Sequence, residues 1–416
     1  MALDFTAAQG ILKRYFANKA VQNSIAKKQS AIWKRMPKKT DLGGDKFSGT
    51  QILKDIFTVS PDFTIAQGLA ANNATSPGLK FEMVPVDLYA PVRVSNKAEA
   101  LSRTDKGAWI KAVGLAAASG MRMFHHVASV FALGTGFGEL ASQGIVYTSG
   151  AGFTVLNGAV SHLVEGMPLV AADSIHGDTL RSATAANITA VDYSTGDVTT
   201  SVANLNGTLG WTTGDFIFLA GARQNSSTPS RVCVVGLRTW IPEVRPVTDA
   251  TITTVEGTLR TGNSRAFGNQ VEQSGSQIDC IQDLVTACVV QGNAEDLTMY
   301  VSSARYRDIA KELRSDQRFM NSTNGTSGFL KLAVAASELT VPIEVDRNLE
   351  DDVGYALPNG AYEFVSAGDY PFIADVNGSW IAVSDGDTRE MRLQGYGVAF
   401  VNDPAACGVA LFQAIT

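Results

Sequence analysis

The residue types that most often carry catalysis or hold metal ions are sparse in this chain. Its four histidines are His125, His126, His162 and His176. His125 and His126 are adjacent in a helical pattern, so their side chains point to different faces and cannot share one ion. We expect surface or packing roles for all four, and we predict no metal site and no cofactor.

The cysteines and the acidic clusters lead to the same expectation. Cys233, Cys280, Cys288 and Cys407 form no CxxC pair, which indicates reduced cysteines in a core. Carboxylates cluster at 350–352 and 385–387, but neither cluster has the spacing of a calcium loop. We expect both clusters to be solvated turns.

Sequence motifs for catalysis are missing as well. The Gly-rich run at 134–138 follows a helix rather than a strand, so it predicts a turn instead of a phosphate cradle. The P-loop, GxSxG and HExxH patterns do not occur. Because no nucleophile, base and oxyanion donor come together, the sequence predicts a protein that is not an enzyme.

Size and charge limit the class of protein. The chain has 416 residues, enough for two or three domains, and no apolar run long enough for a membrane span. Its start shows neither the apolar core nor the cleavage site of a signal peptide. Residues 1–40 carry a charge of +8 and, since the whole chain carries −6, the remainder carries −14. This asymmetry predicts a basic arm that meets an acidic surface or a polyanion, with a solvated basic helix face as the alternative.

One helical pattern, at residues 106–132, dominates the chain. Its apolar positions recur every three or four residues and predict a single stripe, made of Trp109, Val113, Phe124, Val127 and Phe131. At 1.5 Å per residue such a helix is roughly 40 Å long. It needs an equally long partner, and we expect the stripe to pack on residues 388–412.

The segments before this helix cannot fold alone. Residues 5–39 mix basic and apolar positions with too little apolar surface for a core. Two predicted strands, 51–58 and 79–89, flank an excursion rich in Gly, Asn, Ser and Pro. They predict a long two-stranded ribbon, which is barely stable in isolation. Both segments therefore imply contact with neighbours.

The segments after the helix are richer in strands. Residues 144–239 predict a small β domain with a hairpin turn at 194–196 and strands at 163–171, 187–193, 197–202, 215–220 and 231–235. The next region alternates helices at 278–291 and 305–314 with strands at 297–301, 341–346 and 362–366. Two closing strands lie within 388–412 and are interrupted at Asn402-Asp403-Pro404.

This order of parts resembles the major capsid proteins of tailed bacteriophages with the Hong Kong 97-type fold. Local stretches that are similar to the family include LKFEMVPVDLYAPVRVSNKAEAL, MFHHVASVFALGTGFG, DLTMYVSSARYRDIAKELR and MRLQGYGVAFVNDPAACGVAL. The resemblance implies an α+β fold with an N-terminal arm at 1–40, an extended loop at 41–95, a peripheral domain at 96–143 and 380–416, an inserted all-β domain at 144–239 and an axial domain at 240–379.

The resemblance also implies partners. We expect hexamers and pentamers of the chain, an icosahedral shell around double-stranded DNA, a separate scaffolding protein, a portal and a decoration protein, in a virion assembled in the host cytoplasm. The residues predicted to lie at interfaces are Ile11, Lys13, Arg14, Phe16, Lys27, Lys28, Ile32, Trp33, Arg35, Ile52, Lys54, Ile56 and Phe57. Local packing within the same subunit is the alternative for each of them.

Two other classes stay open at this point. An encapsulin-like shell shares the fold but encloses an enzyme, and a hydrolase with a β appendage would need a Ser/His or carboxylate site. Some capsid proteins of this family also join a ribbon lysine to a neighbour's asparagine. The chain offers Lys46, Lys54 and Lys80 with Asn402 as candidates, although no motif selects them.

Overall fold

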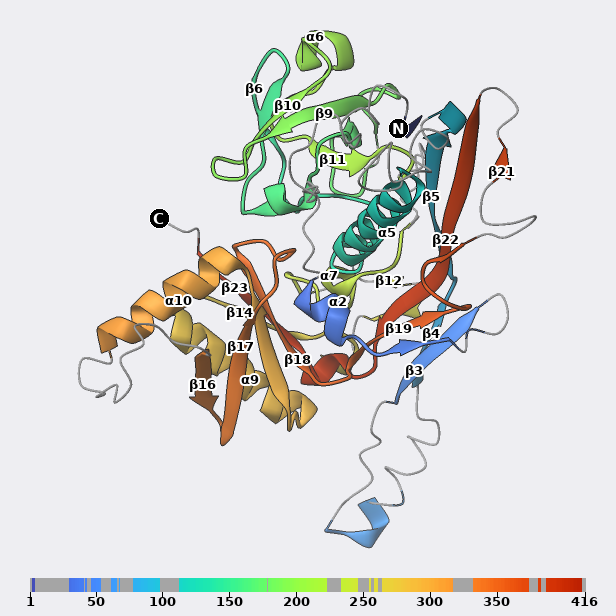
Figure 1. Ribbon diagram of the computed structural model, residues 1–416. Coiled ribbons are helices and arrows are strands. Elements are labelled where there is room, and N and C mark those ends of the chain that lie inside the picture. Colours follow the sequence, from blue (N-terminus) through green and yellow to red (C-terminus); the bar gives the residue numbers. More distant parts are fainter. Residues whose placement is uncertain are drawn as a thin grey trace, which may run out of the picture.

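A computed structural model places long stretches of the chain. The residues it describes are 2–3, 30–40, 42, 46–53, 61–65, 67, 78–97, 112–177, 179–222, 233–245, 254–255, 258–260, 264–316, 332–373, 381–382 and 387–413. Figure 1 shows an elongated sheet along one side, a strand-rich unit at one end and a unit of strands and helices at the other.

The elongated sheet is organised around two strands that are far apart in sequence. β5 (Val86–Ser95) pairs antiparallel with β22 (Thr388–Val401) along its whole length. β22 also pairs with β19 (Tyr362–Ser366), β20 (Phe372–Ile373) and β21 (Ile381–Ala382). Two short N-terminal strands complete the sheet in parallel: β1 (Ala2–Leu3) beside β5 and β2 (Lys38–Lys39) beside β19.

The long helix, α5 (Ala112–Phe131), lies against this sheet (Figure 1). The predicted helix began at 106, and residues 98–111, including Trp109, lie outside the described part of the chain. Gly120 allows the close approach, because a Cβ there would lie 2.3 Å from Val92 Cγ2 and 3.4 Å from Leu393 Cδ1. Phe124 is 1% exposed and belongs to the same core as Leu393.

The prediction that the whole apolar stripe of the long helix packs on residues 388–412 is wrong for part of the stripe. Val127 and Phe131 belong to a second core, which lies under the strand-rich unit. The side chains of the last two turns therefore divide between two bodies: Ala128 packs toward the elongated sheet, while Val127, Val130 and Phe131 pack toward the other unit. A single stripe read from the sequence cannot show that division.

The strand-rich unit is a six-stranded antiparallel sheet in the order β11-β8-β9-β10-β7-β6. Its strands are β6 (Val146–Ser149), β7 (Gly152–Thr154), β8 (Pro168–Ala172), β9 (Ala186–Val191), β10 (Asp197–Thr200) and β11 (Phe216–Leu219). Gly196, with φ +81°, makes the predicted hairpin turn between β9 and β10. The short helices η2 (Ala159–His162) and α6 (Leu205–Leu209) close its core, where Trp211 is fully buried. The strand predicted at 231–235 is not formed at its described residues, 233–235.

The third body is a mixed six-stranded sheet in the order β14-β23-β18-β15-β17-β16. The strands are β14 (Asn269–Glu272), β15 (Leu297–Val301), β16 (Leu332–Ala336), β17 (Leu339–Val345), β18 (Val353–Pro358) and β23 (Gly408–Leu411). α9 (Gln277–Gly292) and α10 (Ser303–Asp316) pack on it through a shared core. The predicted strand 362–366 is β19 of the elongated sheet, whereas β23 joins this one.

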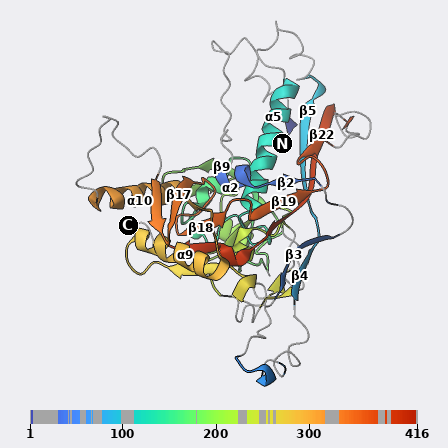
Figure 2. The ribbon, with the colours of Figure 1, turned by 90° about the horizontal axis from the view of Figure 1, so that it is seen from below.

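A two-stranded ribbon leaves the elongated sheet. β3 (Phe47–Leu53) pairs antiparallel with β4 (Gly78–Met83), and Val84-Pro85 separate β4 from β5. The predicted single strand 79–89 is therefore two strands, since Pro85 has no N–H for a ladder. Beyond the ribbon, the short helical turn at 63–65 lies far from the rest of the chain (Figures 1 and 2). The remaining short elements are α2 (Ala31–Arg35), α7 (Leu237–Trp240), β12 (Thr254–Val255), β13 (Thr258–Leu259), η3 (Ser264–Ala266) and η4 (Pro404–Ala406).

Candidate functional site

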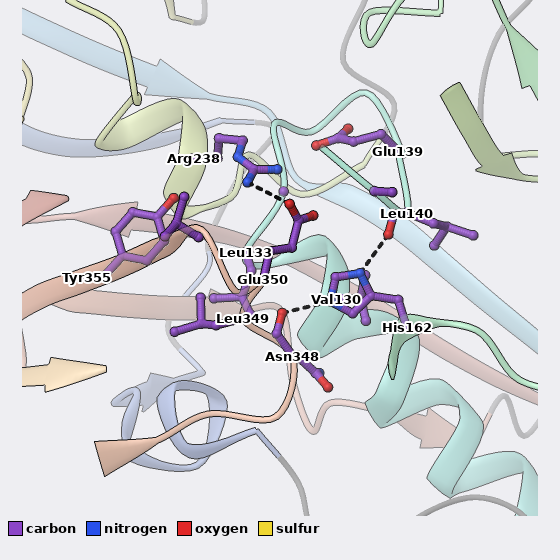
Figure 3. Close-up of a pocket in the computed structure, with 13 residues that line it drawn as sticks. Val130, Leu133, Glu139, Leu140, His162, Arg238, Asn348, Leu349, Glu350 and Tyr355 are labelled. Carbon is purple, nitrogen blue, oxygen red and sulfur yellow. Dashed lines mark hydrogen bonds and ion pairs between the residues drawn. The ribbon is translucent and has the colours of Figure 1, made fainter. Parts of the chain in front are cut away.

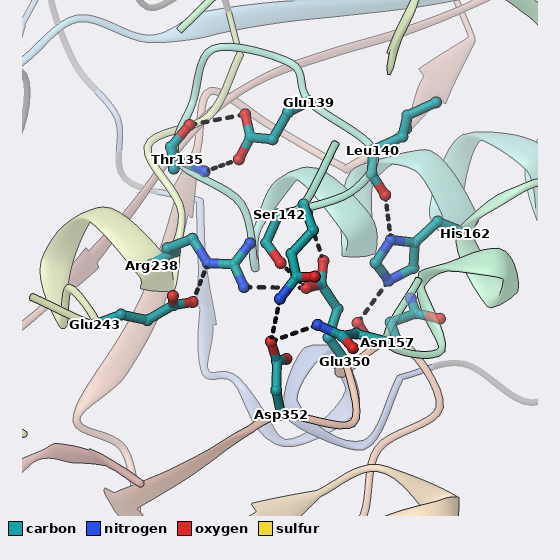
Figure 4. Close-up of polar contacts among 12 residues, drawn as sticks. Thr135, Glu139, Leu140, Ser142, Asn157, His162, Arg238, Glu243, Glu350 and Asp352 are labelled. Carbon is teal, nitrogen blue, oxygen red and sulfur yellow. Dashed lines mark hydrogen bonds and ion pairs between the residues drawn. The ribbon is translucent and has the colours of Figure 1, made fainter. Parts of the chain in front are cut away.

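A largely buried cluster of charged groups lies at the junction of the three bodies. It collects the loop after α5, the η2 region, the start of α7 and the loop at 346–352 (Figure 4). Its centre is an ion pair between Arg238 and Glu350, with Arg238 Nη2 3.4 Å from Glu350 Oε2. Arg238 also donates through Nε to Glu243 Oε1 at 2.7 Å. Glu350 is 4% exposed, so the predicted solvated turn at 350–352 is wrong.

Glu350 stays ionised although it is buried. Burial by itself raises the pKa of Glu350, but the charges of Arg238 and His162 and the bonds from Ser142 hold that pKa below its ordinary value. The Ser142 amide donates to Glu350 Oε1 at 2.9 Å, and its hydroxyl donates to Oε2. The carboxylate thus joins α7 to the segment that leads into the strand-rich unit.

His162 connects two backbone segments through its ring (Figure 3). Its Nδ1 lies 2.6 Å from the Leu140 carbonyl oxygen and its Nε2 2.7 Å from the Asn348 carbonyl oxygen. The ring thereby ties the loop after α5 to the loop at 346–352.

Two further titratable groups flank the junction. His126 donates to the His162 carbonyl oxygen at 3.0 Å, and burial is the main reason that its pKa falls to about 4. Asp352 accepts from Asn157 Nδ2 at 2.7 Å and from Gln143 Nε2 at 3.2 Å. Burial, with the nearby charge of Glu350, raises the pKa of Asp352 to about 6.

Glu139 is a second enclosed carboxyl group of the cluster, 4% exposed like Glu350. It accepts from the Thr135 amide at 2.5 Å and from the Thr135 hydroxyl at 2.7 Å, while its backbone forms a bridge to Phe218 of β11. Burial raises the pKa of Glu139. A cavity of about 20 Å³, with room for one water molecule, lies between Glu139, Arg238 and Tyr355 (Figure 3).

The chemistry available at this junction is structural. Its charges are committed to buried ion pairs and to backbone groups on several elements, so they hold the three bodies in one arrangement. Within the described ranges, no group of three or more His, Cys, Asp or Glu side chains is placed to hold a metal ion. No helix in that part of the chain is long and apolar enough to cross a membrane.

Sequence signals for this site are weak. Of the four histidines, His126 and His162 lie in the junction, whereas His176 packs edge-on against Phe137 and His125 edge-on against Phe124. Glu139 and Arg238 escaped notice. A single charge inside an apolar stretch, as in FGELA and GLRTW, is the signal that could have marked both as buried.

A second polar anchor fixes the end of the basic arm. Asp346 is fully buried and accepts from Ser30 Oγ at 2.5 Å and from the Ile32 amide at 2.8 Å through one oxygen. Its other oxygen accepts from the Asn348 amide at 2.9 Å. Ser30 in turn caps α2 through the Trp33 amide. The first turn of α2 is thereby bound to the loop after β17.

The predicted interface residues fall in different environments. Ile32 is 3% and Trp33 1% exposed, and both lie in the core beneath the elongated sheet. For these two residues the structure agrees with the alternative of local packing within the same subunit. Arg35 is exposed and pairs with Glu344 of the same chain. Ile52 lies in β3, but its side chain is outside the described set. The other nine lie outside the described residues: Ile11, Lys13, Arg14, Phe16, Lys27, Lys28, Lys54, Ile56 and Phe57.

The candidates for a covalent link are also engaged within the chain. Lys46 and Lys80 both pair with Glu82, at 3.8 Å and 2.9 Å. Asn402 donates to Glu363 Oε1 at 2.7 Å, and Lys39 Nζ lies 2.5 Å from the other oxygen of Glu363. Lys54 lies outside the described residues.

The mixed α+β fold, with a long helix on an elongated sheet, a protruding ribbon and a second sheet covered by helices, is the Hong Kong 97-type fold of phage capsid subunits. Two solved structures share it over almost the whole chain. One is the cyanophage A-1(L) capsid, with TM-score 0.52, 9% identity, and 96% of this chain and 97% of that chain covered. The other is the capsid of an empty GTA particle, with TM-score 0.51, 9% identity, and 96% and 95% covered.

Comparison by sequence finds no match, whereas comparison by structure finds the two capsids above. No family model matches the chain, and no curated protein matches it in sequence. The Hong Kong 97-type fold expected from the order of parts is therefore confirmed by the three-dimensional comparison alone, which does not test the inserted domain.

Proposed function

We propose that the chain is the major capsid protein of a tailed phage, which assembles into an icosahedral head around double-stranded DNA. The observation that carries the proposal is the match of 96% of the chain to the two capsid subunits at TM-scores of 0.51 and 0.52. The match extends over nearly the full length of both proteins, as expected if this chain has all the parts of a shell subunit.

The shape of the subunit supports the proposal. The ribbon of β3 and β4 has no core of its own, and the turn at its far end exposes apolar side chains. A two-stranded ribbon is marginally stable in water, so a neighbour's surface would complete it. Assembly into closed rings of six and five then repeats the same heterologous contact around each axis.

The division into domains is part of the proposal. We keep the arm at 1–40, the extended loop at 41–95, the peripheral domain at 96–143 and 380–416, the inserted β domain at 144–239 and the axial domain at 240–379. Six of the described strands pair in a sheet that belongs mainly to another of these domains. β1, β2, β5, β19 and β20 lie in the elongated sheet with β22, and β23 lies in the sheet with β14 and β18.

The predicted partners follow from the same role. We propose interface roles for the predicted residues apart from Ile32 and Trp33, whose side chains are used within the subunit core. The basic residues at 13–28 would meet a neighbour's carboxylates or packaged DNA. A scaffolding protein, a portal and a decoration protein remain proposed partners, in a virion built in the host cytoplasm. The role is mechanical and not catalytic, and the buried junction serves to keep the subunit rigid.

The test is assembly of the purified protein. Size-exclusion chromatography and negative-stain microscopy of the overexpressed chain, with its proposed scaffolding partner where needed, are expected to show closed shells. Particles from infected cells are expected to hold nuclease-protected DNA. Shells that enclose an enzyme and no DNA would support the encapsulin-like alternative, and a permanently monomeric protein with hydrolytic turnover would support the hydrolase alternative.

A further inference from the structure

The loop at 346–352, between β17 and β18, is largely buried. Asp346 is 0% exposed, Asn348 2% and Glu350 4%. The loop contains no helix or strand, so its buried polar groups need hydrogen-bond partners from other parts of the chain. Those partners belong to the base of the arm at α2, to α5, to α7 and to the strand-rich unit.

The first residue of the loop holds the base of the arm. Oδ2 of Asp346 accepts from Ser30 Oγ and from the Ile32 amide, whereas Oδ1 accepts from the Asn348 amide inside the loop. The orientation of one buried carboxylate therefore depends on the arm and on the loop at once. If the arm base leaves, Oδ2 becomes a buried acceptor without a donor, which is costly unless the carboxylate turns toward water.

The middle of the loop depends on that orientation. Asn348 donates from Nδ2 to Ser129 Oγ of α5 at 2.8 Å, and its carbonyl oxygen lies 2.7 Å from His162 Nε2 (Figure 3). A turn of the Asp346 carboxylate removes the hydrogen bond that orients the Asn348 backbone. The contact with η2 of the strand-rich unit is disturbed as a result.

The far end of the loop holds the strand-rich unit and the segment that leads into it (Figure 4). Glu350 accepts from the amide and the hydroxyl of Ser142. The Asp351 amide donates to the Asn157 carbonyl oxygen at 2.8 Å, and Asp352 accepts from Asn157 Nδ2 at 2.7 Å. The arm base and the strand-rich unit thus bind the same short loop at its two ends.

We propose that the loop at 346–352 couples the arm to the strand-rich unit: docking of the arm base on Asp346 stabilises the loop arrangement that holds this unit, and release of the arm base loosens the hold. A packed interior repacks between discrete arrangements and does not deform continuously, so a shift at Asp346 is passed on to Glu350 and Asp352. The coupling is reciprocal, because it is a free energy shared by the two contacts. Its use in a shell rests on the function proposed above: a partner that draws the arm away would free the strand-rich unit to move.

Trypsin cleavage after Lys34 and Arg35 in the unassembled, full-length subunit tests the coupling from the far end of the loop. Ser142→Ala removes one of the two bonds to Glu350, and Ser142 has no hydrogen bond or ion pair with α2 in the described part of the chain. We expect cleavage in this variant to be about threefold faster or more, the order of effect of one lost buried hydrogen bond.

The matched control for this experiment is Arg181→Ala. Arg181 forms an ion pair with Asp215 inside the strand-rich unit, and among the described residues it has no hydrogen bond or ion pair with the loop. Its replacement weakens the same unit without touching the loop at 346–352. Cleavage after Lys34 and Arg35 should therefore keep the wild-type rate.

Hydrogen exchange in the same subunit tests the coupling from the arm. Ser30→Ala removes one donor to the loop, and we expect the backbone amides of Ser142 and Asp351 to exchange about threefold faster or more. Amides of β9 and β10 should keep their wild-type rates, because these strands pair within the strand-rich unit. The matched control is Arg35→Ala, which breaks the pair between α2 and Glu344 of β17, outside the loop, and should change neither set of amides.

The outcomes separate the coupling from the assembly function. Unchanged cleavage in Ser142→Ala, or unchanged exchange at Ser142 and Asp351 in Ser30→Ala, would overturn the coupling. Equal acceleration in Arg181→Ala, or exchange that is faster in β9 and β10 as well, would overturn it too, since general destabilisation then explains the effect. None of these measurements involves assembly, so such results leave the capsid function standing, whereas failure of the wild-type protein to form shells counts against that function.

Discussion

Replacing Asp346 with alanine should release the base of the N-terminal arm. The buried carboxylate accepts three hydrogen bonds, from Ser30 Oγ, the Ile32 amide and the Asn348 amide. Alanine leaves two buried backbone N–H groups without an acceptor, at about 1–3 kcal/mol each, and also removes the bond from the serine. We expect the free energy of unfolding of the subunit to fall by about 4 kcal/mol.

Two measurements on the unassembled subunit check this value. Denaturant titration gives the global change, and trypsin cleavage after Lys34 and Arg35 reports local opening of α2. An opening that is about 4 kcal/mol easier corresponds to roughly a thousandfold faster cleavage, where cleavage follows the open population. Ser30→Ala should lose about 2 kcal/mol. Asp308→Ala, which breaks exposed pairs with Arg307 and Lys311, should lose less than about 1 kcal/mol.

The ranking of the three variants is the decisive result. If Asp346→Ala and Asp308→Ala had the same stability and the same cleavage rate, the carboxylate would not be the anchor of α2. Protection of Lys34 and Arg35 in Asp346→Ala would show that burial of Trp33 alone holds the helix.

Three further outcomes follow from the same structure. Deleting residues 1–29 should leave a folded subunit that forms no shells. Deleting residues 1–35 should also remove Trp33 from the core and lower the free energy of unfolding by about 3–5 kcal/mol. Thermal melting of the two proteins distinguishes these outcomes. Gly120→Ala should destabilise by about 1–3 kcal/mol through its contact with Val92, while Gly368→Ala, with open space around it, should change stability by less than about 0.5 kcal/mol in denaturant titration. The pKa of Asp352 is raised to about 6, so this group stabilises the folded state at low pH, and its contribution is lost as pH rises from about 4 through 6. The pKa of His126 is lowered to about 4, so this group stabilises the folded state above its ordinary pKa, and its contribution is lost as pH falls toward 4. Between pH 4 and 6 the unfolding free energy should therefore rise with pH more steeply in Asp352→Asn than in wild type and less steeply in His126→Gln, and parallel curves for all three proteins would contradict the assignment.

The elements that could be predicted from sequence are those with a strong period of their own. The helix ending at Phe131, the helix at 277–292 and the hairpin turn at Gly196 depend on local patterns, and the structure has them close to the predicted positions. The order of these elements along the chain indicates the fold by itself, because it can be read without knowing which distant residues are in contact.

The junction could not be predicted in this way. Glu350 and Asp352 lie in a run of acidic residues that is typical of a surface turn. Their burial is favourable only because Arg238 and Ser142, from other parts of the chain, contact this run. The same holds for Trp33, whose basic neighbours suggested an arm on the surface. Its burial against Phe364, at a ring distance of 5.2 Å, depends on a strand more than 300 residues further along the chain.

The pairing of β5 with β22 depends on how far translation of the chain has proceeded. Ser95 and Thr388, partners in the ladder, are separated by about 290 residues. At 5–20 residues per second, roughly 15–60 s pass between the translation of the two strands. The elongated sheet, which needs both strands, forms only when the chain is almost complete. A chain that is still on the ribosome therefore lacks half of the surface on which α5 packs.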